Sequence, residues 1–243
     1  MAANAAEARQ MRDAARAKPH LITQVVPSPM TLTVDATINR LIAEDYLGEV
    51  LAVEIRDCSG FIDPDAPLHW REDIEFSGLN IMSLGIWYEA VMRWIGPATR
   101  ALAQAHTFVK TRKDAVGHPT NIRIPDHLAV IAQMACGAQA HIQISRVTGL
   151  AGDSEAFIFG SQGTLRFANG RLYGGGRTDS ALKEITIPPD QQGGWRVETE
   201  FINAIRGLEP ITHTTFDDGL RYMEFTESVS ASIVSGQAVT VLD

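Results

Sequence analysis

The stretch Trp70–Pro97, WREDIEFSGLNIMSLGIWYEAVMRWIGP, contains the strongest single prediction of structure in this chain. After a Ser-Gly turn, apolar residues recur at the spacing of one helix face and predict an amphipathic helix that ends at a Gly-Pro pair. The residues of this apolar stripe are Ile81, Leu84, Tyr88, Val91, Met92 and Ile95. We expect Asn80 to be the N-cap, because its side chain can accept a hydrogen bond from a free amide. Asn80, Ser83 and Trp87 share a second face, where function is expected.

The rest of the chain predicts an α+β fold, because strands dominate the middle and helices lie on both sides of it. In Ala138–Arg146, apolar residues alternate with Gln139, His141, Gln143 and Ser145, as in a strand with one buried face. We therefore expect an open, mainly antiparallel sheet with helices on one face. The expected helices cover residues 3–17, 35–44, 194–206 and 216–234. The expected strands cover residues 20–26, 49–57, 105–111, 126–135, 138–146, 155–160, 163–168, 172–173, 183–187 and 239–242.

Composition and charge exclude several classes of function. The 243 residues carry a net charge of −8, and no block of basic residues occurs, which argues against a nucleic-acid surface. No apolar run is long enough to span a membrane, and the first residues lack the apolar core of a signal peptide. Cys58 and Cys136 form no CxxC, so we expect a reduced, cytoplasmic protein. The seven histidines show no HxH or HExxH spacing, so no metal site is predicted.

Other chemical motifs are weak when the residues are taken alone. Gly174-Gly175-Gly176 lacks the third glycine of GxGxxG and is interpreted as a flexible turn. No GxSxG is present. Arg71, after Trp70, could pair with a phosphate or carboxylate, although a surface arginine beside a packed tryptophan is the favoured interpretation.

Several stretches together resemble the glucose–fructose oxidoreductase, inositol dehydrogenase and rhizopine-catabolism (Gfo/Idh/MocA) family of nicotinamide-dependent dehydrogenases. Residues 2–18, AANAAEARQMRDAARAK, are similar to the helix that follows the Glu-Lys-Pro motif of this family. The Trp-Arg pair, the turn and the helix of the opening stretch follow the family order. FIFGSQGTLRF at 157–167 resembles its strand–turn–strand. The stretches beginning at residues 198 and 216 resemble its closing helices.

The resemblance implies a division of the chain. Residues 1–29 would be the end of a dinucleotide-binding Rossmann domain, and residues 30–243 a substrate-binding and oligomerisation domain. The glycine fingerprint and the Glu-Lys-Pro lysine are absent from these 243 residues. NAD or NADP is therefore the implied cofactor, but we expect no binding of it by this chain alone.

The resemblance also implies roles for individual residues. Ser83 and Trp87 stand at the catalytic positions where the family has Asp and His, and neither side chain can accept a proton at neutral pH. Both are expected to face the substrate. Substrate-binding positions would be Asn80, Tyr88 and His69, and cofactor-binding positions would be Trp70, Arg71 and Trp195. Glu89 is a weak candidate for a base, because it lies two residues after Trp87 and is expected to point away from this face.

The implied activity is oxidation or reduction of a sugar, polyol or related carbohydrate, with this chain alone inactive. The alternative is a non-catalytic carbohydrate-binding or scaffolding module in which Trp70, Trp87 and Tyr88 line the site. In both cases the expected partners are a small carbohydrate-like molecule and a second copy of the chain. The copies would meet through the sheet face that carries Gln139, His141, Gln143 and Ser145.

Overall fold

The computed structural model describes residues 2–58 and 60–241, and it has the α+β architecture that the sequence predicts. Among these residues, nine strands form one sheet in the order β10-β9-β8-β7-β1-β6-β5-β2-β11. Strands β1 and β6 run parallel, and the other neighbouring pairs are antiparallel. A separate hairpin pairs β3 with β4.

The strands have the following bounds: β1 Val50–Cys58, β2 Ala98–His106, β3 Thr111–Lys113, β4 Pro119–Asn121, β5 His127–Met134, β6 Gln139–Ser145, β7 Glu155–Gly160, β8 Gly163–Ala168, β9 Arg171–Gly176, β10 Lys183–Glu184 and β11 Val239–Thr240. The helices are α1 Ala5–Arg16, α2 Asp35–Ala43, α3 Ile74–Ser77, α4 Leu84–Ile95, α5 Val197–Ile205 and α6 Phe216–Ser235, with a 3-10 turn at Trp70–Glu72.

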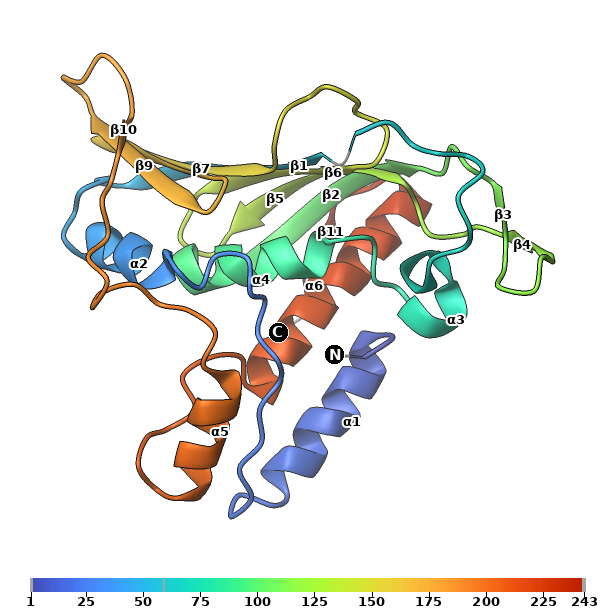
Figure 1. Ribbon diagram of the computed structural model, residues 1–243, viewed down its shortest axis with the longest axis horizontal. Helices are drawn as coiled ribbons and strands as arrows, with labels where there is room; N and C mark the ends of the chain where they lie inside the picture. The colour runs from blue at the N-terminus through green and yellow to red at the C-terminus, as the bar shows by residue number, and fades with distance from the viewer. Residues whose placement is uncertain (1, 59, 242–243) are drawn as a thin grey trace.

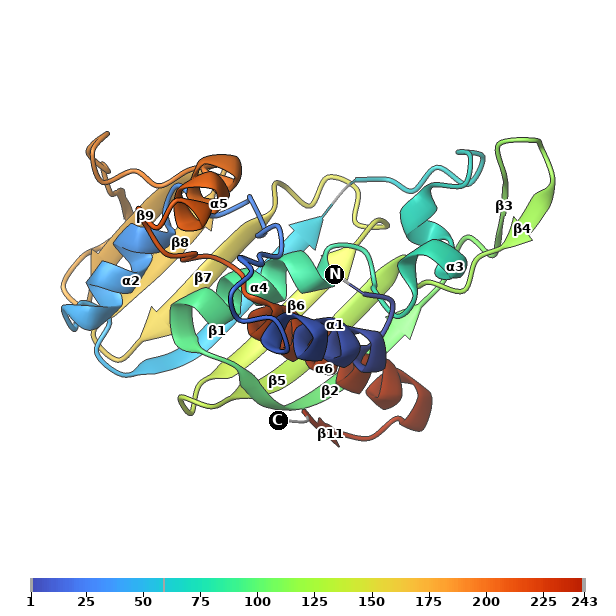
Figure 2. The same ribbon diagram turned by 90° about the horizontal axis from the view of Figure 1, so that it is seen from below.

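Helices α2, α4 and α6 lie on one face of the sheet, and the opposite face carries no helix among the described residues (Figures 1 and 2). The alternation predicted in β6 is confirmed, since Ala140, Ile142 and Ile144 are buried towards the helices while Gln139 and His141 are exposed. Ser145 shares their parity but is buried, because its hydroxyl is hydrogen bonded to His127 Nδ1 at 2.9 Å.

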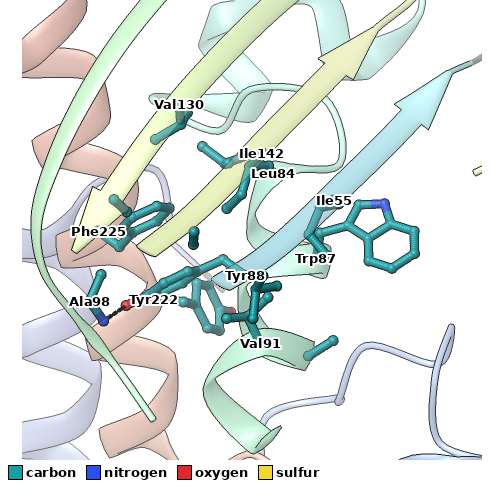
Figure 3. Packing of buried hydrophobic residues seen from close by; sticks show 14 of the residues in the cluster. Ile55, Leu84, Trp87, Tyr88, Val91, Ala98, Val130, Ile142, Tyr222 and Phe225 are labelled. Atoms are coloured by element: carbon teal, nitrogen blue, oxygen red, sulfur yellow. Dashed lines mark hydrogen bonds between the residues drawn. The ribbon is translucent and has the colours of Figure 1, made fainter. Parts of the chain in front are cut away.

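The core lies between the sheet and the pair α4 and α6 (Figure 3). Tyr88 of α4 stacks on Phe225 of α6, with ring centroids 3.6 Å apart and an interplanar angle of 8°. Its hydroxyl accepts a hydrogen bond from the backbone N–H of Ala98, at the start of β2, at 2.8 Å. This single side chain thus connects α4, α6 and the sheet.

Helix α1 packs along α6 through polar contacts at both ends. Near its first turn, the Ala5 amide donates to Glu227 at 3.0 Å and Arg9 pairs with Glu224 at 2.6 Å. Arg16, in its last turn, pairs with Asp217. The assignment of residues 1–29 to a separate domain stays a prediction.

Several predicted bounds differ from those found. Residues 20–26 form no strand, because the Val25 amide bonds to Thr214 O on an irregular segment and no neighbouring strand is present to complete a ladder. The strand expected at residues 105–111 is β2, which begins earlier, at Ala98. This earlier start was not predicted because the alanine-rich sequence of β2 has low strand propensity. Helix α4 begins at Leu84 and α5 at Val197, both later than expected. Leu242, the expected end of the last strand, lies outside the described residues.

Candidate functional site

Two adjoining cavities lie beside the N-terminal half of α4. The larger, about 560 Å³, is enclosed by α4, α3, the 3-10 turn and the segments around Ala3 and Ser28. The smaller, about 180 Å³, lies between the start of α4 and the ends of β1 and β6. Arg71, Met82 and Ile86 line both, so the two cavities share a wall.

Trp70 and Arg71 lie at the mouth of the larger cavity, so the tryptophan is not packed in the core as the favoured interpretation of this pair expected. The His69 imidazole begins their 3-10 turn by accepting the Arg71 amide at Nδ1, 3.2 Å away. The Arg71 guanidinium lies 4.6 Å from the centre of the half-exposed Trp70 ring. Within the described chain, no carboxylate lies within ion-pairing distance of Arg71. The guanidinium is therefore available to a ligand, whereas His69 lines neither cavity.

Asn80 does not cap α4. Its side-chain amide donates to Ala2 O at 3.0 Å and to Ser77 O at 2.8 Å, which closes one end of the larger cavity. Ser83 occupies the N-cap position, but its hydroxyl makes no capping bond. It donates instead to the carboxylate of Asp57, at the end of β1.

Asp57 receives three hydrogen bonds from side chains, two from the start of α4 and one from the loop before β7. The Ser83 hydroxyl and the Trp87 indole, at 3.0 Å, both donate to Oδ2. The Ser154 hydroxyl donates to Oδ1 at 2.5 Å. The two residues that replace an acid and a base in the resemblance thus hold a carboxylate from a neighbouring strand.

The orientation expected for Trp87 was wrong. Its ring is fully buried beneath the sheet, edge-on to Phe167 at 6.4 Å, so only the indole N–H reaches towards the smaller cavity. Figure 3 shows the indole turned away from the Tyr88 and Phe225 cluster. The side chain points inward because α4 is covered by the sheet as well as by α6, which widens its buried stripe.

Tyr88 is also buried, 1% exposed, and lines neither cavity, so the structure contradicts an aromatic face formed by Trp70, Trp87 and Tyr88. Burial raises the pKa of the Tyr88 phenol well above its ordinary value. Its place in the apolar stripe of α4, which the spacing predicted, explains why it packs in the core.

Glu89 lines the larger cavity and not the smaller one that Ser83 lines. Its carboxylate accepts from the Ser28 amide at 3.1 Å, from the Thr214 hydroxyl at 2.5 Å and from Arg93 Nη1 at 2.9 Å. Arg93 in turn pairs with Asp35 at 2.9 Å. These donors tie α4 to the irregular segments on both sides of it and hold the carboxylate in place.

Tyr222 of α6 lines the same cavity and was not foreseen. Its phenol makes no hydrogen bond to another described residue. Burial, and next the charge of Glu89, raise its pKa above the ordinary value. A protonated phenol that faces a cavity can donate a hydrogen bond to a ligand.

Trp195 does not join this site. Its indole donates to Glu198 at 2.8 Å, its side chain is half exposed, and it lines neither cavity. Helix α5, which begins two residues later, is well separated from α3 in both views (Figures 1 and 2).

Residues 2–58 and 60–241 contain neither a metal-binding cluster nor a membrane-spanning helix. In that part of the chain no group of three or more His, Cys, Asp or Glu side chains could hold a metal ion. No helix there is long and apolar enough to cross a membrane.

Residues 36–166, more than half of the chain, match the model of the GFO/IDH/MocA C-terminal domain. No curated protein sequence matches significantly. An oxidoreductase domain protein from Kribbella flavida has a similar structure, with a TM-score of 0.84 and 21% identity over 100% of this chain and 73% of that one. Levoglucosan dehydrogenase in complex with NADH and L-sorbose has a TM-score of 0.86 and 18% identity, over 100% of this chain and 71% of that one. A super-repressor mutant of Gal80p from Saccharomyces cerevisiae has a TM-score of 0.76 and 13% identity, over 99% of this chain and 70% of that one.

Proposed function

This chain belongs to the GFO/IDH/MocA C-terminal domain family, and from that membership we propose that it forms the carbohydrate-binding part of a nicotinamide-dependent oxidoreductase. The observation that carries the proposal is the cavity beside α4. Its mouth combines the exposed Trp70 ring with the unpaired Arg71 guanidinium. An aromatic face next to polar groups suits a sugar, which has an apolar face and a rim of hydroxyls.

The residues of this chain suit a carbohydrate better than they suit the nicotinamide cofactor, NAD or NADP. A dinucleotide needs backbone amides at a helix N-terminus for its pyrophosphate. Gly174–Gly176 does not supply them, because it lies within β9 and opens no helix. This glycine triplet therefore does not form a pyrophosphate cradle, and we derive no step through the cofactor. Trp70 and Arg71 are the side chains that we propose would approach its nicotinamide end.

Proton transfer is a second limit on what this chain does by itself. Hydride chemistry on an alcohol needs a titratable group within hydrogen-bond reach of the reacting hydroxyl. Ser83 and Trp87 cannot serve as that group, and the carboxylates of Asp57 and Glu89 that line the cavities are each held by three donors of the protein itself. We propose that the isolated chain binds a carbohydrate and does not turn it over.

The second candidate function is a non-catalytic carbohydrate-binding or scaffolding module of the same fold. The observation that favours it is that Ser83 and Trp87 both bind Asp57, so their hydrogen bonds are used within the protein. The module and the enzyme part share the cavity, and turnover separates them. In the module, levoglucosan or myo-inositol binds but no NAD⁺ or NADP⁺ is reduced even when a dinucleotide-binding partner domain is added.

The binding experiment uses isothermal titration of the full chain with levoglucosan, D-glucose and myo-inositol, and a fluorescence titration with NADH. We expect saturable binding of at least one carbohydrate, its loss in Trp70→Ala, and no stoichiometric binding of NADH. Trp195→Ala is the matched control, because it removes a similarly exposed indole away from the cavities. Equal carbohydrate binding by the two variants would overturn the placement of the site. Tight binding of NADH would overturn the view that this chain lacks a dinucleotide cradle.

A further inference from the structure

We propose that Asp57 is a ligand-binding residue and that the smaller cavity is a subsite for a hydroxyl of a neutral polyol. This inference rests on the proposed carbohydrate function and specifies its substrate class. The subsite adjoins the larger cavity through Arg71, Met82 and Ile86, so one ligand could occupy both.

The position of Asp57 follows from the sheet topology. Strand β1 runs parallel to β6, and Asp57 lies opposite Ile144 in the register, so both strands deliver their last residues to the same edge. Val53, Ile55 and Asp57 alternate towards the helices, and the first two are buried in the core. Asp57 is thus a carboxylate at an inward position, where the core ends and the cavity begins.

The hydrogen-bond capacity of Asp57 is not exhausted. An ionised carboxylate can accept about four hydrogen bonds, two at each oxygen. Ser83 and Trp87 fill Oδ2, whereas Oδ1 accepts only from Ser154 among the described residues. One acceptor position therefore remains on a side chain that three donors hold in place.

The charges around the subsite favour a hydroxyl over an anion. Asp57 would repel a carboxylate or phosphate, and Arg146 is already paired with Glu72 at 3.0 Å. Arg71 remains as an unpaired donor on the shared wall. A hydroxyl can donate to Asp57 while it or its neighbour accepts from Arg71, so the pair matches the vicinal hydroxyls of a sugar or cyclitol.

Ser83 and Trp87 acquire a role in this arrangement. Neither exchanges a proton, yet both fix the orientation of the carboxylate from α4. They are positioning residues for Asp57, which is the group that would touch the ligand.

The test follows the chemical shift of the Trp87 indole N–H by NMR in the full chain labelled with ¹⁵N. The chain has four tryptophans, so each indole N–H can be assigned with a Trp→Phe variant. D-glucose is the neutral probe and D-glucuronate its anionic counterpart. We expect D-glucose to shift the Trp70 and Trp87 signals saturably, and to leave Trp94 and Trp195, which bond to Asp35 and Glu198 away from both cavities, unmoved. D-glucuronate should bind more weakly.

The matched variants are Asp57→Asn and Asp65→Asn, the latter on an exposed loop. We expect Asp57→Asn to weaken D-glucose binding by about tenfold or more, the value of one charge-assisted hydrogen bond, and Asp65→Asn to change it less than about twofold. Unchanged binding by a folded Asp57→Asn overturns the subsite and leaves the proposed function intact. So does a Trp70 shift without a Trp87 shift in the wild type, a result that does not depend on a variant. Tighter binding of D-glucuronate overturns the neutral class. If neither these two probes nor levoglucosan and myo-inositol bind, both proposals are overturned.

Discussion

Trp87 of α4 donates its indole N–H to Asp57 of β1 across 3.0 Å, although the two residues are 30 positions apart in sequence. The bond lies beside a fully buried ring, where the low dielectric strengthens an interaction with a charged acceptor. It joins the first turns of the central helix to the end of a central strand. The candidate site therefore rests on the same contact that holds helix and sheet together.

We expect Trp87→Phe to lower the free energy of unfolding by about 2–4 kcal/mol, because it removes a hydrogen bond to a charged group and leaves space in the core. Denaturant unfolding followed by circular dichroism measures the change. Trp195→Phe is the control, since its indole bonds to Glu198 at the surface, and it should cost no more than about 0.5 kcal/mol. Equal costs for the two variants would show that the Asp57 bond contributes nothing to stability.

The elements near the site were predictable from local patterns. Helical spacing located α4 and placed Tyr88 in its buried stripe, and strict alternation identified β6 and its two faces. Both patterns show which side of an element is buried in the core, and burial of apolar surface is the dominant favourable contribution to folding. Trp70 and Arg71, which received a role only through the family resemblance, line the larger cavity.

The partners of those residues were not predictable, because they come from distant parts of the chain. Helical spacing predicts that Trp87 lies one turn from Ser83, but it cannot show that a strand end brings Asp57 to both. Tyr222 faces the cavity from α6, more than a hundred residues after Glu89. One signal was present for Asp57, since it is a charged residue at the inward phase of the Val53 and Ile55 alternation.

The buried phenols predict a loss of stability at alkaline pH. The pKa values of Tyr88 and Tyr222 are raised in the folded protein, chiefly by burial, so the folded state holds these protons more tightly than the unfolded state. Their contribution is complete below the unfolded pKa of about 10 and is lost as pH rises through the folded values. Ultraviolet absorbance of phenolate should show these two of the four tyrosines ionising only with unfolding. Ionisation of all four in the folded protein near pH 10 would contradict the burial.

Glu89→Gln should lower the pKa of Tyr222, because the Glu89 charge is one of the two causes that raise it. The variant should also lose about 2 kcal/mol of stability, since an amide cannot serve the Ser28, Thr214 and Arg93 donors equally, although Arg93 keeps Asp35. Phenolate absorbance measures the first effect, with Tyr222→Phe to identify the signal, and denaturant unfolding the second. A Tyr222 pKa that does not move would mean that water screens the carboxylate from the phenol.

The exposed face of the sheet should mediate association of two copies, as we propose from its sequence pattern. Leu102 and Ile131 lie opposite each other on β2 and β5, and His141 lies opposite Ile131 on β6. The two apolar side chains are 41% and 46% exposed on a face that no described helix covers. Burying one isoleucine contributes about 1.5–3 kcal/mol, so Ile131→Asp should raise the dimer dissociation constant by about tenfold or more. Light scattering after size exclusion measures it, with Val116→Asp, an exposed residue in the β3–β4 loop, as the matched control. If Ile131→Asp and the wild type have the same mass at every concentration, the copies do not meet through this face.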